Sequence, residues 1–331
     1  MYHGFTDLDY HDRANSFLNL TEGKHLQIKK FRAQLLYLKR RYNIISLHHF
    51  VECCKNHKKL PKNSLIITID DGYLSNYKLA YPLLNRLNIP ATIFVTTDFI
   101  QQQKFLWTDR IEYAFNRVKT DKYQLKTKIQ DKTKAISKTQ DIFMNLSSEA
   151  QKIAWARKVK QMIKARPQEQ RLSVVEELES LLKNKLILNS ETPQIYLPLS
   201  WEQIREMRNS KIISIGSHTH THPILTQCTP SVIKQEINLS KKLIEQNTRA
   251  KIDLFCYPNG TSRDFNDYTK EVLKDNDYYC ATTIEGFNDQ HSDLFALKRI
   301  WVSQEMSRIE FIMDLAGLKT WIKNILSKII Y

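Results

Sequence analysis

Residues 65–96 read LIITIDDGYLSNYKLAYPLLNRLNIPATIFVT, and this stretch decides the fold class. It opens with Leu65–Ile69, a nearly continuous apolar run that is typical of a strand buried on both faces of a parallel sheet. Residues 74–87 are helical in pattern, and Pro90 breaks the helix. Ala91–Thr96 is the next buried strand. A strand, a helix and a second strand in this order indicate parallel α/β structure.

The same alternation continues on both sides of this stretch. Apolar residues recur with helical period in Gln27–Tyr42 and predict a helix with one buried face. Further strands are expected near Asn43–Leu47, Lys211–Ile215, Ile252–Cys256, Tyr278–Thr283 and Ala296–Val302, and further helices over Trp201–Met207 and Ser231–Gln246.

The segment from about residue 101 to residue 195 differs from its surroundings. It is rich in Lys, Gln and Glu, poor in strand signals and helical in period, and Ser148 with Gln151 resembles a capping box. We interpret residues 101–195 as a helical insertion between two strands, within a single domain that covers residues 1–331.

Composition and charge limit the classes of function. The 331 residues are 42% hydrophobic, which allows a sizeable core, and the net charge is +15. Such a charge fits either a lysine-rich surface or attraction to an acidic partner: a phospholipid surface, a lipid-phosphate-linked sugar or an anionic glycan. We expect no nucleic-acid partner, because the sequence has no recognised nucleic-acid motif and its basic residues are spread along the chain.

The sequence also carries signals of location. Five Cys residues without a CxxC pair favour reduced thiols. The N-terminal MYHGFTDLDYHDR has no apolar signal region, and no run of 18 apolar residues exists. We therefore expect a cytoplasmic protein, with possible peripheral contact at the inner membrane face. A secreted protein is the alternative if the true start lies upstream of Met1.

The last segment, residues 316–331, predicts an amphipathic helix. Two arrangements are open: the helix docks on its own domain, or it lies on a membrane surface with its lysines in water. Its apolar face consists of Leu318, Trp321, Ile322, Ile325, Leu326, Ile329 and Ile330.

Two adjacent carboxylates, Asp70 and Asp71, directly follow the buried strand. Parallel α/β folds place function at the carboxyl ends of their strands. Neighbouring carboxylates repel each other, and a bound cation removes that conflict. One Asp would bind the metal while the other stays available as a base. The alternative is an ordinary Asp-Asp-Gly surface turn.

A histidine cluster, GSHTHTHP at residues 216–223, also follows an expected strand. Imidazole is a good ligand for zinc and other borderline divalent metals. An extended segment would place His218, His220 and His222 on one face, whereas a helical turn would pair His218 with His222 and point His220 away. Two histidines and one aspartate leave room for water, as a catalytic metal site requires.

A third segment, FCYPNG at residues 255–260, reads as an ordinary turn in isolation. Taken together and in this order, the three segments resemble the polysaccharide deacetylases of carbohydrate esterase family 4. The opening Met1-Tyr2-His3 further resembles the branch that includes the poly-N-acetylglucosamine deacetylases. The resemblance covers most of the chain outside the insertion and implies a distorted (β/α) barrel of about seven parallel strands with a helical insertion.

The resemblance also implies roles for individual residues. Asp70 matches the family's general base, and Asp71, His218 and His222 match its metal ligands, which excludes His220. His3 matches the histidine proposed as general acid. Tyr257, with Pro258 and Asn259 beside it, sits where a backbone N–H helps to hold the oxyanion, and Arg299 is expected to orient Asp70.

Two features depart from the family pattern. The usual arginine a few residues before the Tyr-Pro pair is absent, because Leu254 and Phe255 stand there. The late Leu-x-His motif is absent as well, and the nearby His291 lies in a polar loop.

The function that follows is metal-dependent hydrolysis of the N-acetyl group of an amino sugar, releasing acetate. The substrate would be a polysaccharide, an oligosaccharide or a lipid-linked glycan. One divalent metal ion is expected; zinc is favoured, with nickel, cobalt or iron as alternatives. Three other functions are open: a deformylase of a lipid-linked amino sugar, a non-catalytic glycan-binding module, and a different metal hydrolase that uses three histidines.

Overall fold

The structure is a computed structural model that describes residues 1–118, 122–130, 137–284 and 286–318. In this described part of the chain, no helix combines the length and the apolar character that a membrane span requires.

The chain forms two compact units. We call the first the barrel unit; it contains residues 1–8, 23–104 and the chain from residue 193 onward. We call the second the insertion unit; it contains residues 9–22 and 105–192. The assignment of the whole chain to one deacetylase-like domain remains a prediction.

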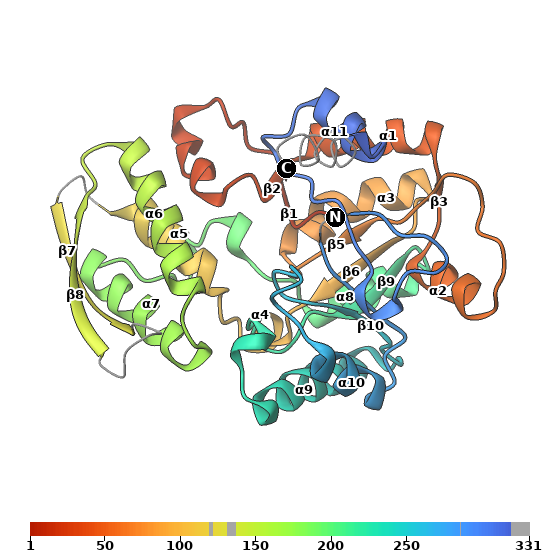
Figure 1. Ribbon diagram of the computed structural model, residues 1–331. Helices are drawn as coiled ribbons and strands as arrows, with labels where there is room; N and C mark the ends of the chain where they lie inside the picture. The colour runs from red at the N-terminus through yellow and green to blue at the C-terminus, as the bar shows by residue number, and fades with distance from the viewer. Residues whose placement is uncertain (119–121, 131–136, 285, 319–331) are drawn as a thin grey trace, which may run out of the picture. The chain divides into compact units, whose positions relative to one another are not determined.

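A parallel sheet of five strands, in the order β11-β10-β9-β6-β5, lies at the centre of the barrel unit (Figure 1). Its longest pairing joins β6 to β9, from Ala91 opposite Ile213 to Val95 opposite Ser217. The apolar run before Asp70 ends in β5, the outermost strand of this order, and its residues Ile67 and Ile69 are buried, as its composition predicts. The strands are β5 (Thr68–Ile69), β6 (Ala91–Val95), β9 (Ile213–Ser217), β10 (Leu254–Cys256) and β11 (Cys280–Thr282).

Two more segments extend this sheet at its edges. Tyr2 forms a parallel bridge with Ile69 at one edge, and Leu297 forms a parallel bridge with Thr282 at the other. The predicted strand at Ala296–Val302 thus pairs only at isolated points instead of forming a continuous ladder.

Backbone hydrogen bonds join these two edge segments to each other. The Met1 nitrogen donates to the Ile300 carbonyl at 2.5 Å, and the Val302 N–H donates to the Met1 carbonyl at 3.1 Å. Seven segments therefore close into a distorted barrel, which confirms the predicted fold class. The N-terminal residues lie between β5 and the segment that carries Arg299.

Helices pack around the sheet, and α8 and α9 both contact β9 (Figure 1). Apolar side chains from the strands and from these helices form one main core, in which Ile69, Ile93 and Phe255 are fully buried. The helices are α1 (Ile28–Arg41), α2 (Leu47–Lys55), the π-helical turn η2 (Asn76–Ala80) that leads into α3 (Tyr81–Leu87), α4 (Thr97–Gln101), α8 (Trp201–Asn209), α9 (Pro230–Thr248), α10 (Asp267–Asp275) and α11 (Arg308–Leu315), with short 3-10 turns at Gln194–Tyr196, Leu225–Gln227 and Leu294–Ala296.

The apolar run at Leu65–Ile69 serves two sheets instead of forming one strand. Its first half, β4 (Ser64–Leu65), pairs with β3 (Asn43–Ile44), and its second half is β5. Another small parallel pair joins β1 (Gly4–Thr6) to β2 (His25–Gln27), two strands that the sequence did not predict.

The insertion unit is not purely helical, although the sequence predicts a helical insertion at residues 101–195. Lys122–Gln130 (β7) and Ser137–Asn145 (β8) form an antiparallel hairpin beside three helices. The sequence of β7, KYQLKTKIQ, alternates apolar with polar residues, which is the signal of a half-buried strand. The helices are α5 (Trp107–Arg117), α6 (Glu149–Lys164) and α7 (Gln168–Leu182), and a 3-10 helix at Arg13–Thr21 joins them.

The predicted C-terminal helix at residues 316–331 lies largely outside the described residues. Helix α11 ends at Leu315, and Gly317 has a left-handed backbone with φ of 72°. The amphipathic character of the last residues therefore remains a prediction from sequence.

Candidate metal centre and active site

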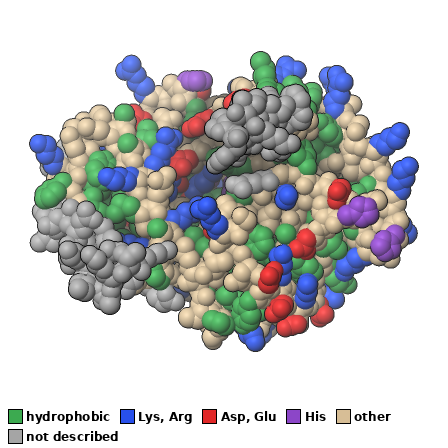
Figure 2. All heavy atoms as spheres, viewed as in Figure 1, with side chains coloured by type: hydrophobic (Ala, Val, Ile, Leu, Met, Phe, Trp, Pro, Cys, Tyr) green, Lys and Arg blue, Asp and Glu red, His purple; other side chains and the backbone are tan. Residues whose placement is uncertain are grey.

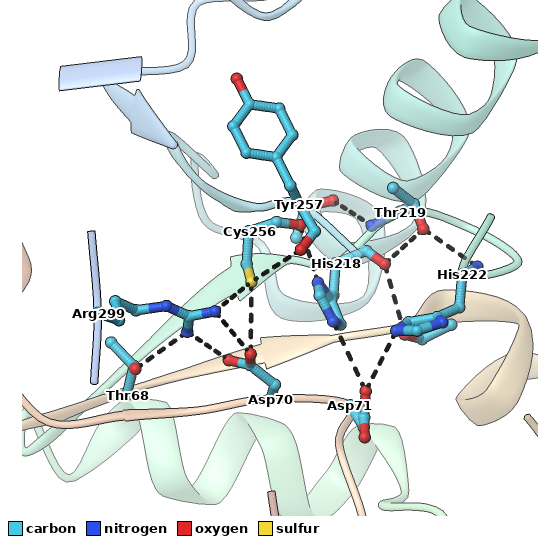
Figure 3. A network of polar contacts seen from close by, with 11 residues as sticks. Thr68, Asp70, Asp71, His218, Thr219, His222, Cys256, Tyr257 and Arg299 are labelled. Carbon is cyan, nitrogen blue, oxygen red and sulfur yellow. Dashed lines mark hydrogen bonds and ion pairs between the residues drawn. The ribbon is translucent and has the colours of Figure 1, made fainter. Parts of the chain in front are cut away.

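The three sequence segments singled out above converge at the carboxyl ends of their strands (Figure 3). Asp70 and Asp71 follow β5, His218 follows β9, and Tyr257 follows β10. Parallel strands end at one edge of the sheet, so residues far apart in sequence meet there.

Asp71, His218 and His222 form a group that could hold one metal ion. The Oδ1 atom of Asp71 lies 3.6 Å from Nε2 of His218 and 3.5 Å from Nε2 of His222. Two ligands of a tetrahedral zinc ion, with bonds of about 2.1 Å, lie about 3.4 Å apart. The donor set and its spacing therefore fit a divalent ion with room for further ligands.

A hydrogen bond fixes the orientation of the His218 ring. Its Nδ1 lies 2.8 Å from the carbonyl oxygen of Cys256. Because a carbonyl only accepts, Nδ1 carries the proton and Nε2 presents its lone pair toward Asp71. This is the tautomer that a metal ligand needs.

The loop between the two histidines has an unusual backbone. Thr219 has φ of 68° and His222 has φ of 60°, and Asp71, which follows β5, has φ of 77°. Such left-handed conformations of non-glycine residues cost about 1–3 kcal/mol each and persist only where surrounding contacts hold them. The Thr219 hydroxyl supplies two contacts, because it donates to the His218 carbonyl at 2.5 Å and accepts from the His222 N–H at 3.1 Å.

The side chain of His220 points away from this group. Its Nδ1 lies 2.8 Å from Oγ1 of Thr97, and its Nε2 lies 3.8 Å from Oδ1 of Asp98. The loop is thus neither a straight strand nor a regular helix. It places His218 and His222 beside Asp71 and His220 beside Thr97, and the role of each histidine remains a prediction.

Asp70 faces Arg299 instead of the histidines. The guanidinium donates to both carboxylate oxygens, at 2.7 Å and 2.8 Å, and also to the Thr283 carbonyl and the Thr68 hydroxyl. Burial alone would raise the pKa of Asp70, but the charge and hydrogen bonds of Arg299 outweigh burial and hold it well below its usual range. Asp70 is therefore a carboxylate that Arg299 holds in one orientation, and the catalytic importance of this pairing remains a prediction.

In a second group, the ligand atoms of Asp70, His218 and Cys256 lie within 4.8 Å of one another, close enough to share a metal ion. Both oxygens of Asp70 are already bonded to Arg299, and the Cys256 Sγ lies 3.0 Å from the same guanidinium. Burial raises the pKa of the Cys256 thiol well above its usual value, which disfavours the thiolate that a metal needs. We therefore favour the group around Asp71.

His3 lies close enough to Asp70 and His218 for their charges to affect it. Burial is the main cause that lowers the pKa of His3 to about 3, so its ring is neutral in the free protein. A role as general acid, which remains a prediction, therefore requires that the ring take up a proton during the reaction.

The proposed oxyanion role of the Tyr257 N–H does not fit this structure. That N–H donates to the Thr282 carbonyl at 3.2 Å as part of the sheet. The Tyr257 ring stacks on Phe265, and its hydroxyl donates to the Phe295 carbonyl. These contacts fix Tyr257 at the end of β10. Its N–H, which the resemblance assigned to the oxyanion, is already hydrogen-bonded within the sheet.

The other two residues of the predicted oxyanion segment form a turn. The Gly260 N–H donates to the Pro258 carbonyl at 2.8 Å, and Asn259 between them is left-handed with φ of 60°. Sequence reasoning overlooked Cys256, although its place directly before Tyr257 at a strand end was a usable signal.

We predict that metal content separates the ligands from the base. His218→Ala, His222→Ala and Asp71→Asn should each lose bound zinc, because each removes one of three ligands. Asp70→Asn should keep its zinc, and so should His291→Ala, a control in an exposed loop. Elemental analysis after equilibration with zinc and desalting measures this. Equal loss in Asp70→Asn and Asp71→Asn would contradict the division of roles.

Known proteins share both sequence and fold with this chain. The sequence model of the polysaccharide deacetylase family matches residues 57–281. A poly-beta-1,6-N-acetyl-D-glucosamine N-deacetylase of Staphylococcus epidermidis is 32% identical over 110 residues. That match covers 30% of this chain and 38% of the relative, so it spans less than half of the relative's length.

Two solved structures have the same fold. The Streptococcus pyogenes deacetylase PplD, solved in complex with acetate, aligns with a TM-score of 0.59 at 18% identity, over 95% of this chain and 96% of that one. IcaB from Ammonifex degensii aligns with a TM-score of 0.57 at 15% identity, over 96% and 95%. The family model matches more than half of the residues of this chain, and the chain therefore belongs to the polysaccharide deacetylase family.

Proposed function

We propose that the protein hydrolyses the N-acetyl group of an amino sugar in a glycan and releases acetate. The observation that carries the proposal is the pairing of two differently held carboxylates: Asp70 is fixed by Arg299, while Asp71 faces His218 and His222. Membership of a carbohydrate deacetylase family supports a hydrolase. The polymer in the name of the Staphylococcus relative, β-1,6-linked N-acetyl-D-glucosamine, is the first substrate to test.

The metal would be one divalent ion, with zinc favoured by the His and Asp donor set. Held by Asp71, His218 and His222, it would supply a Lewis acid that polarises the amide carbonyl and lowers the pKa of water. The protein's own part begins with His218, whose Nε2 is aimed by the bond from Nδ1 to Cys256. Asp71 brings the negative charge that a dication requires.

Asp70 would act as the base that accepts the proton of the attacking water. Because Arg299 holds both of its oxygens, the carboxylate stays ionised and keeps one orientation. The same pairing lowers the pKa of Asp70 and so makes it a weaker base, but it also holds the carboxylate in one orientation. The leaving amine must receive a proton, and His3 is the proposed donor once its ring has taken one up.

We predict that Arg299 sets the acidic limit of activity. Activity requires ionised Asp70 and is lost as pH falls through its pKa, which Arg299 holds low. In Arg299→Met, burial is unopposed, so the acidic limb of the kcat/KM profile should move to higher pH. Arg299→Lys keeps the charge without the two-pronged contact and should show a smaller shift.

Thermal unfolding of both variants identifies any loss of fold, because an unpaired buried carboxylate costs about 3–5 kcal/mol. An acidic limb that stays in place in folded Arg299→Met and Arg299→Lys would show that Arg299 does not set the pKa of the base.

We predict that the purified protein releases acetate from N-acetylated amino-sugar oligomers, and that chelation and Asp70→Asn each abolish release. A panel of polymeric, oligomeric and lipid-linked substrates, each in N-acetyl and N-formyl form, measures this. Preferred release of formate would point to a deformylase. Glycan binding without release of either acid would point to a binding module and reject the proposal.

The place of action is a separate proposal: the cytoplasmic face of the inner membrane, where the net charge of +15 would draw the protein to anionic lipid. Figure 2 shows lysine and arginine side chains dispersed over the visible face among acidic ones, so the attraction would be diffuse. The apolar residues that follow Leu318 in the sequence would add insertion.

Co-sedimentation with liposomes tests this proposal. We predict that binding needs anionic lipid, weakens with added salt and falls when residues 318–331 are removed. Liposome binding that does not change with salt concentration, or no binding at all, would reject the membrane proposal. Either result would leave the proposed chemistry unaffected.

A further inference from the structure

The loop from His218 to His222 must hold one shape for both of its proposed ligands to reach one ion. Its backbone does not hold that shape through regular hydrogen bonding, because Thr219 and His222 are left-handed. Contacts from neighbouring elements must therefore stabilise it.

Two residues after β6 hold the beginning of the loop. The Thr97 N–H donates to the Thr219 carbonyl at 3.3 Å, and the Asp98 N–H donates to the His220 carbonyl at 2.9 Å. These contacts reach the loop as far as His220. They leave the backbone N–H groups of His220 and Thr221 to another partner.

That partner is Glu236, which lies on α9 and is only 7% exposed. Its Oε2 accepts from the backbone N–H groups of both His220 and Thr221 at 2.8 Å, and its Oε1 accepts from the Thr221 hydroxyl at 2.6 Å. Hydrogen bonds to an ionised carboxylate are short and about twice as strong as neutral ones. One buried side chain thus binds the two residues directly before His222.

We propose that Glu236 is a positioning residue of the metal site, which holds the histidine loop in the shape that brings His222 to Asp71. It is not one of the proposed ligands and acts through its hydrogen bonds to the loop. Removing it would free His220 and Thr221 to rotate, and the strained φ at His222 would relax. The inference rests on the proposed metal site and adds a residue from a helix that the active-site motifs do not include.

The chemistry of the contact makes Glu236→Gln a useful conservative variant. Its amide oxygen can face the two N–H groups, and its amide nitrogen can donate to the Thr221 hydroxyl, so all three hydrogen bonds survive without the charge. Glu236→Met has a similar size but no acceptor. Gln235→Ala, an exposed neighbour on the same helix, is the matched control.

The experiment titrates metal-free protein with Co²⁺ and Zn²⁺ against a competing chelator and records the Co²⁺ absorption spectrum. Glu236→Met should bind both ions roughly 10–100-fold more weakly and show an altered Co²⁺ spectrum. Glu236→Gln should stay much closer to the parent protein, and Gln235→Ala should match it. Thermal unfolding of the metal-free forms identifies variants that have lost the fold.

Each failure has a distinct signature. If the parent protein binds no metal, the proposed metal site fails. If the parent binds metal and folded Glu236→Met binds it equally well with the same spectrum, the positioning role fails. If Glu236→Gln and Glu236→Met weaken metal binding equally, the charge of Glu236 and not its hydrogen bonds supports the site, and the proposed hydrogen-bond role is wrong. Should Glu236→Met not fold, Thr221→Val must still weaken binding by a smaller factor, and no weakening there would overturn the proposal.

Discussion

Two adjacent buried carboxylates are the constraint on which this structure depends. Asp70 is 2% exposed and Asp71 is 5% exposed, and neighbouring charges of one sign cannot both be buried without compensation. The protein separates their partners: Arg299 lies on one side of the pair, and the imidazoles of His218 and His222 lie on the other. This division gives two neighbouring residues of the same type two different chemical roles.

The closure of the barrel brings the partner of Asp70 into place. Arg299 comes from the last segment of the barrel, which Met1 joins to β5 through hydrogen bonds to Ile300 and Val302. The closure keeps the segment that carries Arg299 close to the end of β5, where the guanidinium also donates to Thr68 and Thr283. The residue that aligns the proposed base thus stands far from the position where the family pattern places an arginine, since Leu254 occupies that neighbourhood.

Much of this could be predicted from the sequence, because the signals were local. Apolar β-branched runs predicted the buried strands. Because functional residues of parallel α/β folds lie at the carboxyl ends of strands, Asp70 and His218 were expected at the same end of the sheet. Alternation in the β7 segment was a readable signal that its lysine-rich composition obscured. The sheet partner of the Tyr257 N–H and the contact of Glu236 with the histidine loop could not be predicted, because both depend on how distant segments pack.

The most direct test of this account is a crystal structure of the zinc-loaded protein with anomalous diffraction recorded at the zinc edge. We expect one peak within bonding distance of Asp71, His218 and His222, with Asp70 still held by Arg299. A peak within bonding distance of Asp70, His218 and the neighbouring Cys256 thiol, with the guanidinium displaced, would contradict the division of the two carboxylates.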